Sequence, residues 1–389
     1  MKRTDGFVLK QINQIPYLLP YGQRIAEHRR GMRLNEAGVF LWNHLSQAGT
    51  RDELLTLFAR HYEALPSEIP ILARDMNAFL DELCTWGMLE DEKEPPCARH
   101  KLYLGGLSVD LNTPPELSIP QFDAFCAKKD NAPDFTIHIK SGSGLSCSPS
   151  GGQLLVCTEE LFVIEQETEY HIRFPLAPQI TECRLKKDGT RANLYVVPPF
   201  REPLLSDLFH AIRLLFLYRA QQSGRIAIHS ASLYYREKAW LFAGSSGTGK
   251  STHTNLWNAW FHTPVINGDL NLIGLLDGQP MVFGTPWCGT SGVFHTGKLP
   301  LGGIIHLKQN GTNECQPLTK DAQTLSLLYR TISPSWTGEL MDRNLQLAAS
   351  ISEKIYNTRL LCTKTPEAAF FMRQQIDAFF SLKADDKKI

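Results

Sequence analysis

A glycine-rich segment in the second half of the chain has the residue types and spacing of a phosphate-binding loop. Residues Gly244–Ser251 read GSSGTGKS and satisfy the pattern G-x-x-x-x-G-K-[ST] in full. In this pattern backbone N–H groups converge on phosphate oxygens, and glycines stand where a Cβ would keep the backbone away from them. The predicted nucleotide-binding residues are Gly244, Ser245, Ser246, Gly247, Thr248, Gly249, Lys250, Ser251 and Thr252.

Two side chains of this loop have predicted roles toward a nucleoside triphosphate. The Lys250 ammonium would meet the β- and γ-phosphates, and the Ser251 hydroxyl would ligate a Mg²⁺ ion that bridges them. The apolar run Ala239–Ala243 precedes the loop, and a predicted helix, Ser251–Phe261, follows it. Because the motif requires this strand–loop–helix order, we expect ATP and Mg²⁺ as cofactors. A glycine-rich turn ahead of a helix cap is the alternative.

Two further polar residues stand next to apolar strands near the loop. Asp269 follows the predicted strand Val265–Ile266 and is the best candidate for the carboxylate ligand that Mg²⁺ needs. His229 lies within the otherwise apolar strand Ile226–Leu233. With Lys250 they form the predicted catalytic set. The alternatives are an ordinary aspartate in a tight Gly-Asp turn and a structural strand histidine.

The loop Gly284–Gly292 is expected to lie across the substrate side of this site, because glycines, a proline and polar groups are concentrated there. Trp287 and Thr290 are candidate contacts to substrate or nucleotide. For Cys288 we expect loop packing, with a reactive thiol as the alternative. Three basic residues are candidate phosphate clamps or solvated surface cations: Lys298, Arg330 and Arg343.

The residues before the glycine-rich loop predict separate domains. Gly6–Tyr21 is β-like, and apolar periodicity from Leu34 to Leu89 predicts three helices, the second starting at a capping box of Thr50 and Glu53. The charged, proline-containing run Glu90–Pro96 predicts a linker. We therefore predict a first domain at residues 1–92 and a linker at 93–100.

Short β-patterned runs recur through residues 101–199, and Leu204–Gln222 has the pattern of one amphipathic helix. From residue 224 onward predicted strands alternate with helices. We predict a strand-rich lobe ending in a helix at 101–223 and a mixed-sheet α/β domain with the glycine-rich loop at 224–389.

The composition of the 389 residues excludes several classes of protein. Lys and Arg total 40, as do Asp and Glu, so no global field would attract nucleic acid or anionic lipid. No run approaches the about 18 apolar residues of a membrane-spanning helix, and the N-terminus lacks a signal peptide's apolar segment. The 9 cysteines are scattered without a C-x-x-C pair, which argues against disulfide and zinc scaffolds. We expect a cytoplasmic protein without nucleic-acid or membrane partners.

His229, Lys250, Ser251 and Asp269 together resemble the site of the HPr kinase/phosphorylase family, whose P-loop domain is related to phosphoenolpyruvate carboxykinase. The resemblance covers roughly residues 224–380 and implies transfer of a phosphoryl group from ATP to a hydroxyl. Gly268 stands where that family has the first of two aspartates, usually assigned as the general base. Asp269 would then combine metal and base duties, or another group such as His229 would serve.

A second resemblance covers Gly31–Glu92, which is similar to a PqqD-type domain: a β-element, three helices and the run Leu34-Asn35-Glu36-Ala37. Members of that family bind leader segments of ribosomally made peptides as an added strand. The resemblance implies a winged-helix-like domain that binds a precursor peptide or protein substrate. A helical module with a purely structural role is the alternative.

Together these features favour an ATP- and Mg²⁺-dependent kinase for a hydroxyl, expected to be a serine, on a ribosomally made peptide or protein. Two alternatives remain open, a small-metabolite kinase and a catalytically silent ATP-binding sensor or peptide-binding module. The sequence leaves the acceptor and the direction of the reaction open. HPr kinases form ring oligomers, so a homo-oligomer is open as well.

Overall fold

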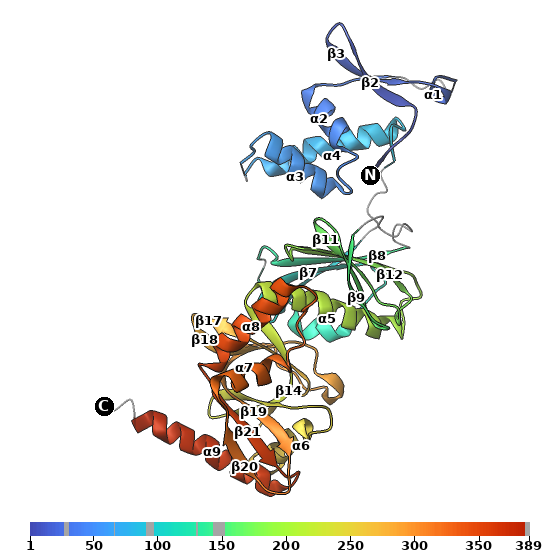
Figure 1. Cartoon of the computed structure of the whole chain (residues 1–389). Helices are drawn as coiled ribbons and strands as arrows, with labels where there is room; N and C mark the ends of the chain where they lie inside the picture. The colour runs from blue at the N-terminus through green and yellow to red at the C-terminus, as the bar shows by residue number, and fades with distance from the viewer. Residues whose placement is uncertain (27–30, 66, 91–96, 130, 143–151, 386–389) are drawn as a thin grey trace. The chain divides into compact units, whose positions relative to one another are not determined.

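A computed structural model divides the chain into two units, Met1–Pro95 and Pro96–Ile389, each with a hydrophobic core of its own. The structure describes the chain except for residues 27–30, 66, 91–96, 130, 143–151 and 386–389 (Figure 1). The predicted linker at 93–100 lies partly outside the described residues, and its last residues belong to β6 (Ala98–Leu104).

The first unit combines a β-hairpin with a helical core. Strands β2 (Phe7–Ile12) and β3 (Ile15–Pro20) form the hairpin, and β4 (Met32–Arg33) pairs with β3. The two-residue strands β1 (Lys2–Arg3) and β5 (Leu89–Glu90) pair with each other. The helices are α1 (Gln23–Ala26), α2 (Glu36–His44), α3 (Arg51–His61) and α4 (Ile69–Thr85). The core contains Leu18, Leu41, Trp42, Leu54, Phe58, Met76 and Leu80.

The helices predicted between Leu34 and Leu89 are confirmed as α2, α3 and α4, but the predicted capping box is confirmed only in part. Thr50 Oγ1 accepts the N–H of Glu53 at 3.2 Å, as expected. The Glu53 carboxylate accepts the N–H of Gly49 at 2.9 Å, one residue before the N-cap position that a capping box uses.

The second unit begins with an eight-stranded sheet in the order β6-β7-β8-β13-β12-β11-β10-β9. The strands after β6 are β7 (Leu107–Thr113), β8 (Phe135–Ser141), β9 (Gln153–Cys157), β10 (Phe162–Glu165), β11 (Glu169–Arg173), β12 (Ile180–Lys186) and β13 (Arg191–Val196). Alternate residues of β8 and β13 are buried, which places one face of the sheet in the core. The prediction that this region is rich in strands is confirmed.

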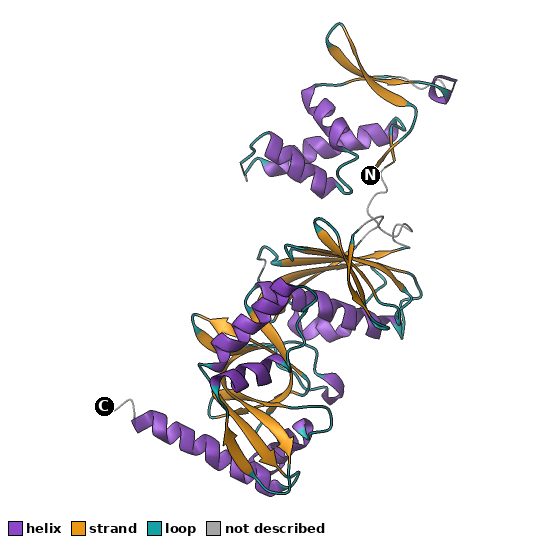
Figure 2. Ribbon diagram, in the orientation of Figure 1, coloured by secondary structure: helices purple, strands orange, loops and turns teal. Residues whose placement is uncertain are grey.

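Helix α5 (Leu204–Gln222) lies against this sheet and also contacts β14 (Arg225–Tyr235), as Figure 2 shows. Its bounds match those of the predicted amphipathic helix. The buried residues, however, extend beyond the single apolar face that was predicted. Leu217, Tyr218 and Ala220 are buried as well. One hydrophobic core joins the sheet, α5 and residues of the following region, including Leu272 and Trp287. The parts predicted as 101–223 and 224–389 therefore share a core.

The remaining strands form a mixed sheet whose pairings close in the circuit β15-β14-β17-β18-β19-β15. Strand β15 pairs parallel with β19, which pairs parallel with β21, and the other pairings are antiparallel. Beyond β14 the strands are β15 (Lys238–Ala243), β16 (Val265–Asn267), β17 (Leu270–Leu276), β18 (Gln279–Phe283), β19 (Lys298–Gln309), β20 (Glu314–Pro317) and β21 (Tyr356–Cys362).

Helices alternate with these strands, as predicted from residue 224 onward. They are α6 (Lys250–Phe261), α7 (Lys320–Leu328), α8 (Gly338–Ser352) and α9 (Pro366–Asp385), with a 3-10 turn at Gly289–Ser291. The prediction of a mixed α/β architecture is confirmed. Within the part of the chain that the structure describes, each helix is too short or too polar to cross a lipid bilayer.

Three histidines of the second unit make its stability sensitive to acid. Burial lowers the pKa values of His253, His295 and His306 to about 4. In an unfolded chain histidine titrates near about 6.5. Between these values the unfolded state binds protons that the native state does not, so the free energy of unfolding falls as the pH falls.

We predict that His306→Gln reduces the slope of unfolding free energy against pH between these values, by up to about 1.4 kcal/mol per pH unit. Urea unfolding at a series of pH values measures the slope. The exposed His210 gives a matched control, His210→Gln, which should keep the wild-type slope. A wild-type slope in His306→Gln would contradict the prediction.

Candidate functional site

The glycine-rich loop connects buried strand β15 to helix α6, and its backbone conformation explains its glycines. Gly247 and Gly249 have φ angles of 77° and 105°, in the left-handed region that side chains disfavour. A Cβ on Gly244 would come within 2.5 Å of Thr248 Oγ1. The local geometry therefore has the strand, glycine turn and helix N-terminus that a phosphate-binding loop requires.

The predicted lysine of the loop is half-buried and points back across it. Lys250 Nζ donates to the carbonyl oxygen of Gly244 at 3.2 Å, and burial lowers its pKa. Of the three candidate phosphate clamps, Arg330 reaches the loop, where it donates to Ser245 Oγ at 3.0 Å. Arg343 forms a surface ion pair with Glu339 within α8, and Lys298 is exposed; no contact of either with the loop is found among the described residues.

Two residues that the sequence did not single out also contact the loop. Gln309 Nε2 donates to the carbonyl oxygen of Gly247 at 2.7 Å, and Lys364 Nζ donates to it at 3.2 Å. Both follow from strand order, because β19 and β21 run parallel to β15 and end on the same side of the sheet. Only knowledge of that parallel pairing would have placed these residues at the loop.

His229 and Asp269 form a pair on the other side of the loop. His229 Nδ1 lies 3.2 Å from Asp269 Oδ1, and the two side chains are 36% and 30% exposed. The N–H of Ser230 donates to the carbonyl oxygen of Asp269 at 2.9 Å, which fixes their strands in register. Among the described residues we find no hydrogen-bond partner for His229 Nε2, so this nitrogen is available to a substrate.

The turn that contains Asp269 is stabilised by the side chain of Asn267 and not by the Asp269 carboxylate. The side-chain oxygen of Asn267 accepts the N–H groups of Asp269 and Leu270, at 2.9 and 3.0 Å. The Asp269 carboxylate is thereby left for other contacts. The hydrogen bond with His229 lowers its pKa, burial opposes this, and the charges of Arg213 and Lys250 lower it further. The carboxylate is ionised at neutral pH, as a metal ligand or a partner for imidazole must be.

Gly268 has no room for a side chain. A Cβ at this position would overlap both Cβ and Oγ of Ser291. Ser291 is held there by its hydroxyl, which donates to the carbonyl oxygen of Cys288 at 2.7 Å. The space beside Asp269 is therefore filled from the loop Gly284–Gly292, and a second carboxylate cannot enter it without moving that loop.

The other predictions for this loop have different outcomes. Trp287 is only 2% exposed, and its indole N–H donates to the carbonyl oxygen of Phe209 at 3.0 Å. It is a core residue, so the prediction that it contacts substrate or nucleotide is wrong. Burial raises the pKa of the Cys288 thiol, which favours loop packing over reactivity. Thr290 is exposed, and its role stays a prediction.

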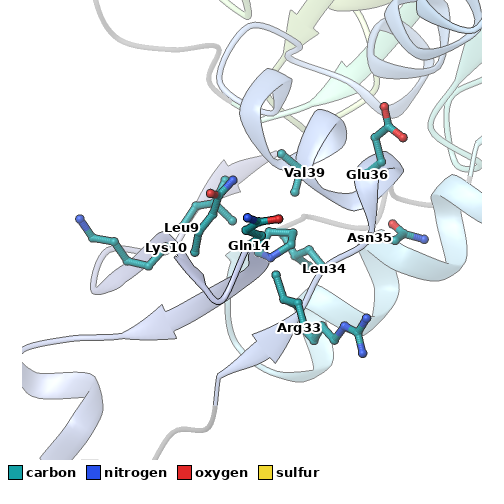
Figure 3. A pocket seen from close by; sticks show the side chains of 11 residues that line it. Leu9, Lys10, Gln14, Arg33, Leu34, Asn35, Glu36 and Val39 are labelled. Atoms are coloured by element: carbon teal, nitrogen blue, oxygen red, sulfur yellow. The ribbon is translucent and has the colours of Figure 1, made fainter.

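A second candidate site lies in the first unit, between the β2–β3 hairpin and the start of α2. It is an open pocket of about 640 Å³ (Figure 3). Leu9, Leu34 and Val39 give it an apolar lining, while the charged residues Lys10 and Arg33 also line it. Its shape and lining suit a segment with an apolar side chain and polar flanks.

Residues 25–89 match the family model described as Coenzyme PQQ synthesis protein D (PqqD). This segment includes β4 and helices α2 to α4, and it supports the resemblance read from the run Leu34-Asn35-Glu36-Ala37.

Among solved structures, the chain is similar to the Hpr(Ser) kinase/phosphatase from Coxiella burnetii. The sequence identity is 10%, the match covers 42% of this chain and 94% of that chain, and the TM-score is 0.24. A TM-score of this size does not establish a shared fold. No curated protein matches the chain.

Because Ser291 lies so close to Gly268, a side chain at position 268 should clash with it, and removal of the Ser291 side chain should relieve the clash. Gly268→Ala should destabilise the protein by about 1–3 kcal/mol, because the new methyl group overfills the space. Adding Ser291→Gly should restore most of the loss. Urea unfolding of the single and double variants measures this coupling.

Gly311→Ala is the matched control, since a Cβ there would meet nothing within 4 Å. It should unfold like the wild type. If Gly268→Ala is as stable as the wild type, Ser291 does not occupy the space beside Asp269.

Proposed function

We propose that this protein is an ATP- and Mg²⁺-dependent phosphotransferase that phosphorylates a hydroxyl, expected to be a serine, on a ribosomally made peptide or protein. The observation that supports it most is the position of the His229–Asp269 pair beside a glycine-rich loop with bound cationic side chains. Positioning and charge neutralisation are the main contributions that phosphoryl transfer needs from a protein.

The loop has the chemistry to hold the phosphates of ATP. The α6 N-terminus supplies backbone N–H groups, and Lys250, Arg330 and Lys364 supply positive charge around it. The loop's own carbonyl and hydroxyl oxygens engage these three side chains, and phosphate oxygens are stronger acceptors for them. Removal of this charge should weaken nucleotide binding.

Ser251 and Asp269 are the residues that would hold Mg²⁺. Because His229 engages Asp269 Oδ1, Oδ2 remains for the ion. No cluster of three or more His, Cys, Asp or Glu side chains suited to a metal is found in the described part of the chain. This fits Mg²⁺, which takes one or two protein ligands and completes its coordination with phosphate and water. When bound, the ion would neutralise charge on the β- and γ-phosphates.

His229 is the proposed general base, and Asp269 orients it. Asp269 Oδ1 accepts the Nδ1–H of His229, which leaves Nε2 to take the proton of the acceptor hydroxyl. The hydroxyl oxygen then bonds to the γ-phosphorus, and the bond from that phosphorus to the β–γ bridging oxygen breaks. ADP leaves with the electron pair. The filled space at Gly268 supports this assignment, since it leaves no room for a carboxylate base there.

The first unit is proposed to bind the peptide substrate. Residues 25–89 match the PqqD model, and domains that resemble it bind leader peptides. The sheet β2-β3-β4 has β2 and β4 as its edges, and the pocket adjoins both. A leader segment that adds to one edge could insert an apolar side chain between Leu9 and Val39.

Intact-mass spectrometry tests the proposed function. Candidate precursor peptides encoded beside the gene are incubated with protein, ATP and Mg²⁺. We expect one peptide to gain a phosphate with the wild type, and no gain with Lys250→Ala or Asp269→Asn. Lys320→Ala, an 84% exposed lysine, should behave like the wild type. If nucleotide binds but no peptide gains mass, the small-metabolite kinase or the silent sensor becomes the better explanation.

The assignment of the base predicts a loss of turnover without a loss of binding. His229→Gln should lower the rate of phosphorylation by about 10²–10⁴-fold, because general-base catalysis contributes that much, while ATP affinity stays unchanged. Single-turnover kinetics and calorimetry measure the two quantities. Full activity in His229→Gln would assign the base to Asp269 instead.

If the pocket binds the peptide, a substitution in it should weaken peptide binding and leave the rate of the chemical step unchanged. Val39→Asp should raise the KM for the peptide by about tenfold or more with kcat unchanged, because a carboxylate would be desolvated under the bound segment. Asn43→Asp, exposed on the same helix, is the control. An unchanged KM in Val39→Asp would exclude the pocket as the peptide site.

A further inference from the structure

Arg213 is a half-buried cation on α5, on the helix face that meets the loop Gly284–Gly292. It lies one turn from Phe209 and one turn from Phe216, so the three share a face. The rings of Phe209 and Phe216 pack on Trp287 at centroid distances of 5.7 and 5.3 Å. The hydrogen bond from Trp287 to the carbonyl oxygen of Phe209 fixes this contact.

The same loop continues from Trp287 to the acidic residue of the site. A Cβ on Gly289 would come within 2.9 Å of Asp269 Cβ, so the loop backbone touches Asp269 two residues after Trp287. Helix α5, the loop and Asp269 are therefore consecutive layers of one packed region.

The charge of Arg213 has no partner of its own. Among the described residues we find no hydrogen bond or ion pair to its guanidinium, although burial lowers its pKa and Asp269 partly opposes that effect. Asp269 is hydrogen-bonded to His229 instead. A guanidinium has five N–H donors, which are therefore available to an anion. An anion bound between Arg213 and the glycine-rich loop would satisfy them.

We propose that Arg213 is a further residue of the phosphoryl-transfer site and that it binds the γ-phosphoryl oxygens of ATP. The inference rests on the proposed function. In the proposed mechanism the γ-phosphoryl group lies beside Asp269 and His229, and Arg213 is on the face of α5 that packs against the loop touching Asp269. Lys250 and Arg330 hold the phosphates from the loop side, and Arg213 holds the transferring group from the acceptor side. The strand-rich lobe thereby contributes a side chain to the site.

Isothermal titration with ADP and with AMP-PNP, a non-hydrolysable ATP analogue, each with Mg²⁺, tests this role. Arg213→Gln should weaken AMP-PNP binding by about tenfold, the loss expected for a charge-assisted hydrogen bond, and leave the affinity for ADP within about twofold. Arg213→Lys keeps the charge but not the planar guanidinium, so its affinity for AMP-PNP should lie between those of the wild type and Arg213→Gln.

Arg219→Gln is the matched control on the same helix, because Arg219 faces Asp134 at 3.9 Å instead of the site. It should bind both nucleotides like the wild type. The inference is overturned if Arg213→Gln weakens the binding of ADP and AMP-PNP equally, or if it weakens the binding of neither. If Arg213→Gln does not fold, the same comparison is made with Arg213→Lys. Wild-type protein that binds neither nucleotide would contradict the proposed function itself.

Discussion

The site depends on the middle of β14, where pairing with β17 on one edge of the strand ends and pairing with β15 on the other edge begins. From Arg225 to His229 this strand pairs with β17, and from Ser230 to Tyr235 it pairs with β15. At this point, the N–H of His229 donates to the carbonyl oxygen of Arg330, and the N–H of Ser230 donates to that of Asp269. Successive N–H groups of a strand point to opposite sides. One dipeptide therefore holds Arg330 and Asp269 on its two sides, where β15 ends and the glycine-rich loop begins.

This arrangement explains which parts of the molecule could be predicted from the sequence. The loop is a local motif, and the bounds of α5 follow from local apolar periodicity, so both were predicted well. Gln309 and Lys364 reach the loop through strand pairings between distant residues, which one sequence does not reveal. Trp287 was misread because its loop is rich in glycine and proline, while its indole packs against a helix far away in the chain.

The environment of Gly268 shows a similar limit. From the sequence, a glycine in this position is only the absence of a carboxylate. In the structure it is one side of a complementary pair, because Ser291 fills the space. A loop is packed into the space beside Gly268, and the neighbouring acidic group, Asp269, is hydrogen-bonded to an imidazole. The His229–Asp269 pair and the filled space are two results of the same local packing.

The shared core around α5 also limits how the second unit can move. Many kinases close two lobes on the substrate about a hinge, but such a rotation here would separate Trp287 from Phe209 and Phe216 and break a core that runs through α5. Packed cores of this kind switch between discrete arrangements and do not deform smoothly. Movement within the second unit is therefore expected in short loop segments such as Gly289–Gly292, whose two glycines have φ angles of 60° and 66°. For the proposed function, this means that a nucleotide would be admitted by local opening of this loop, with the packed scaffold unchanged.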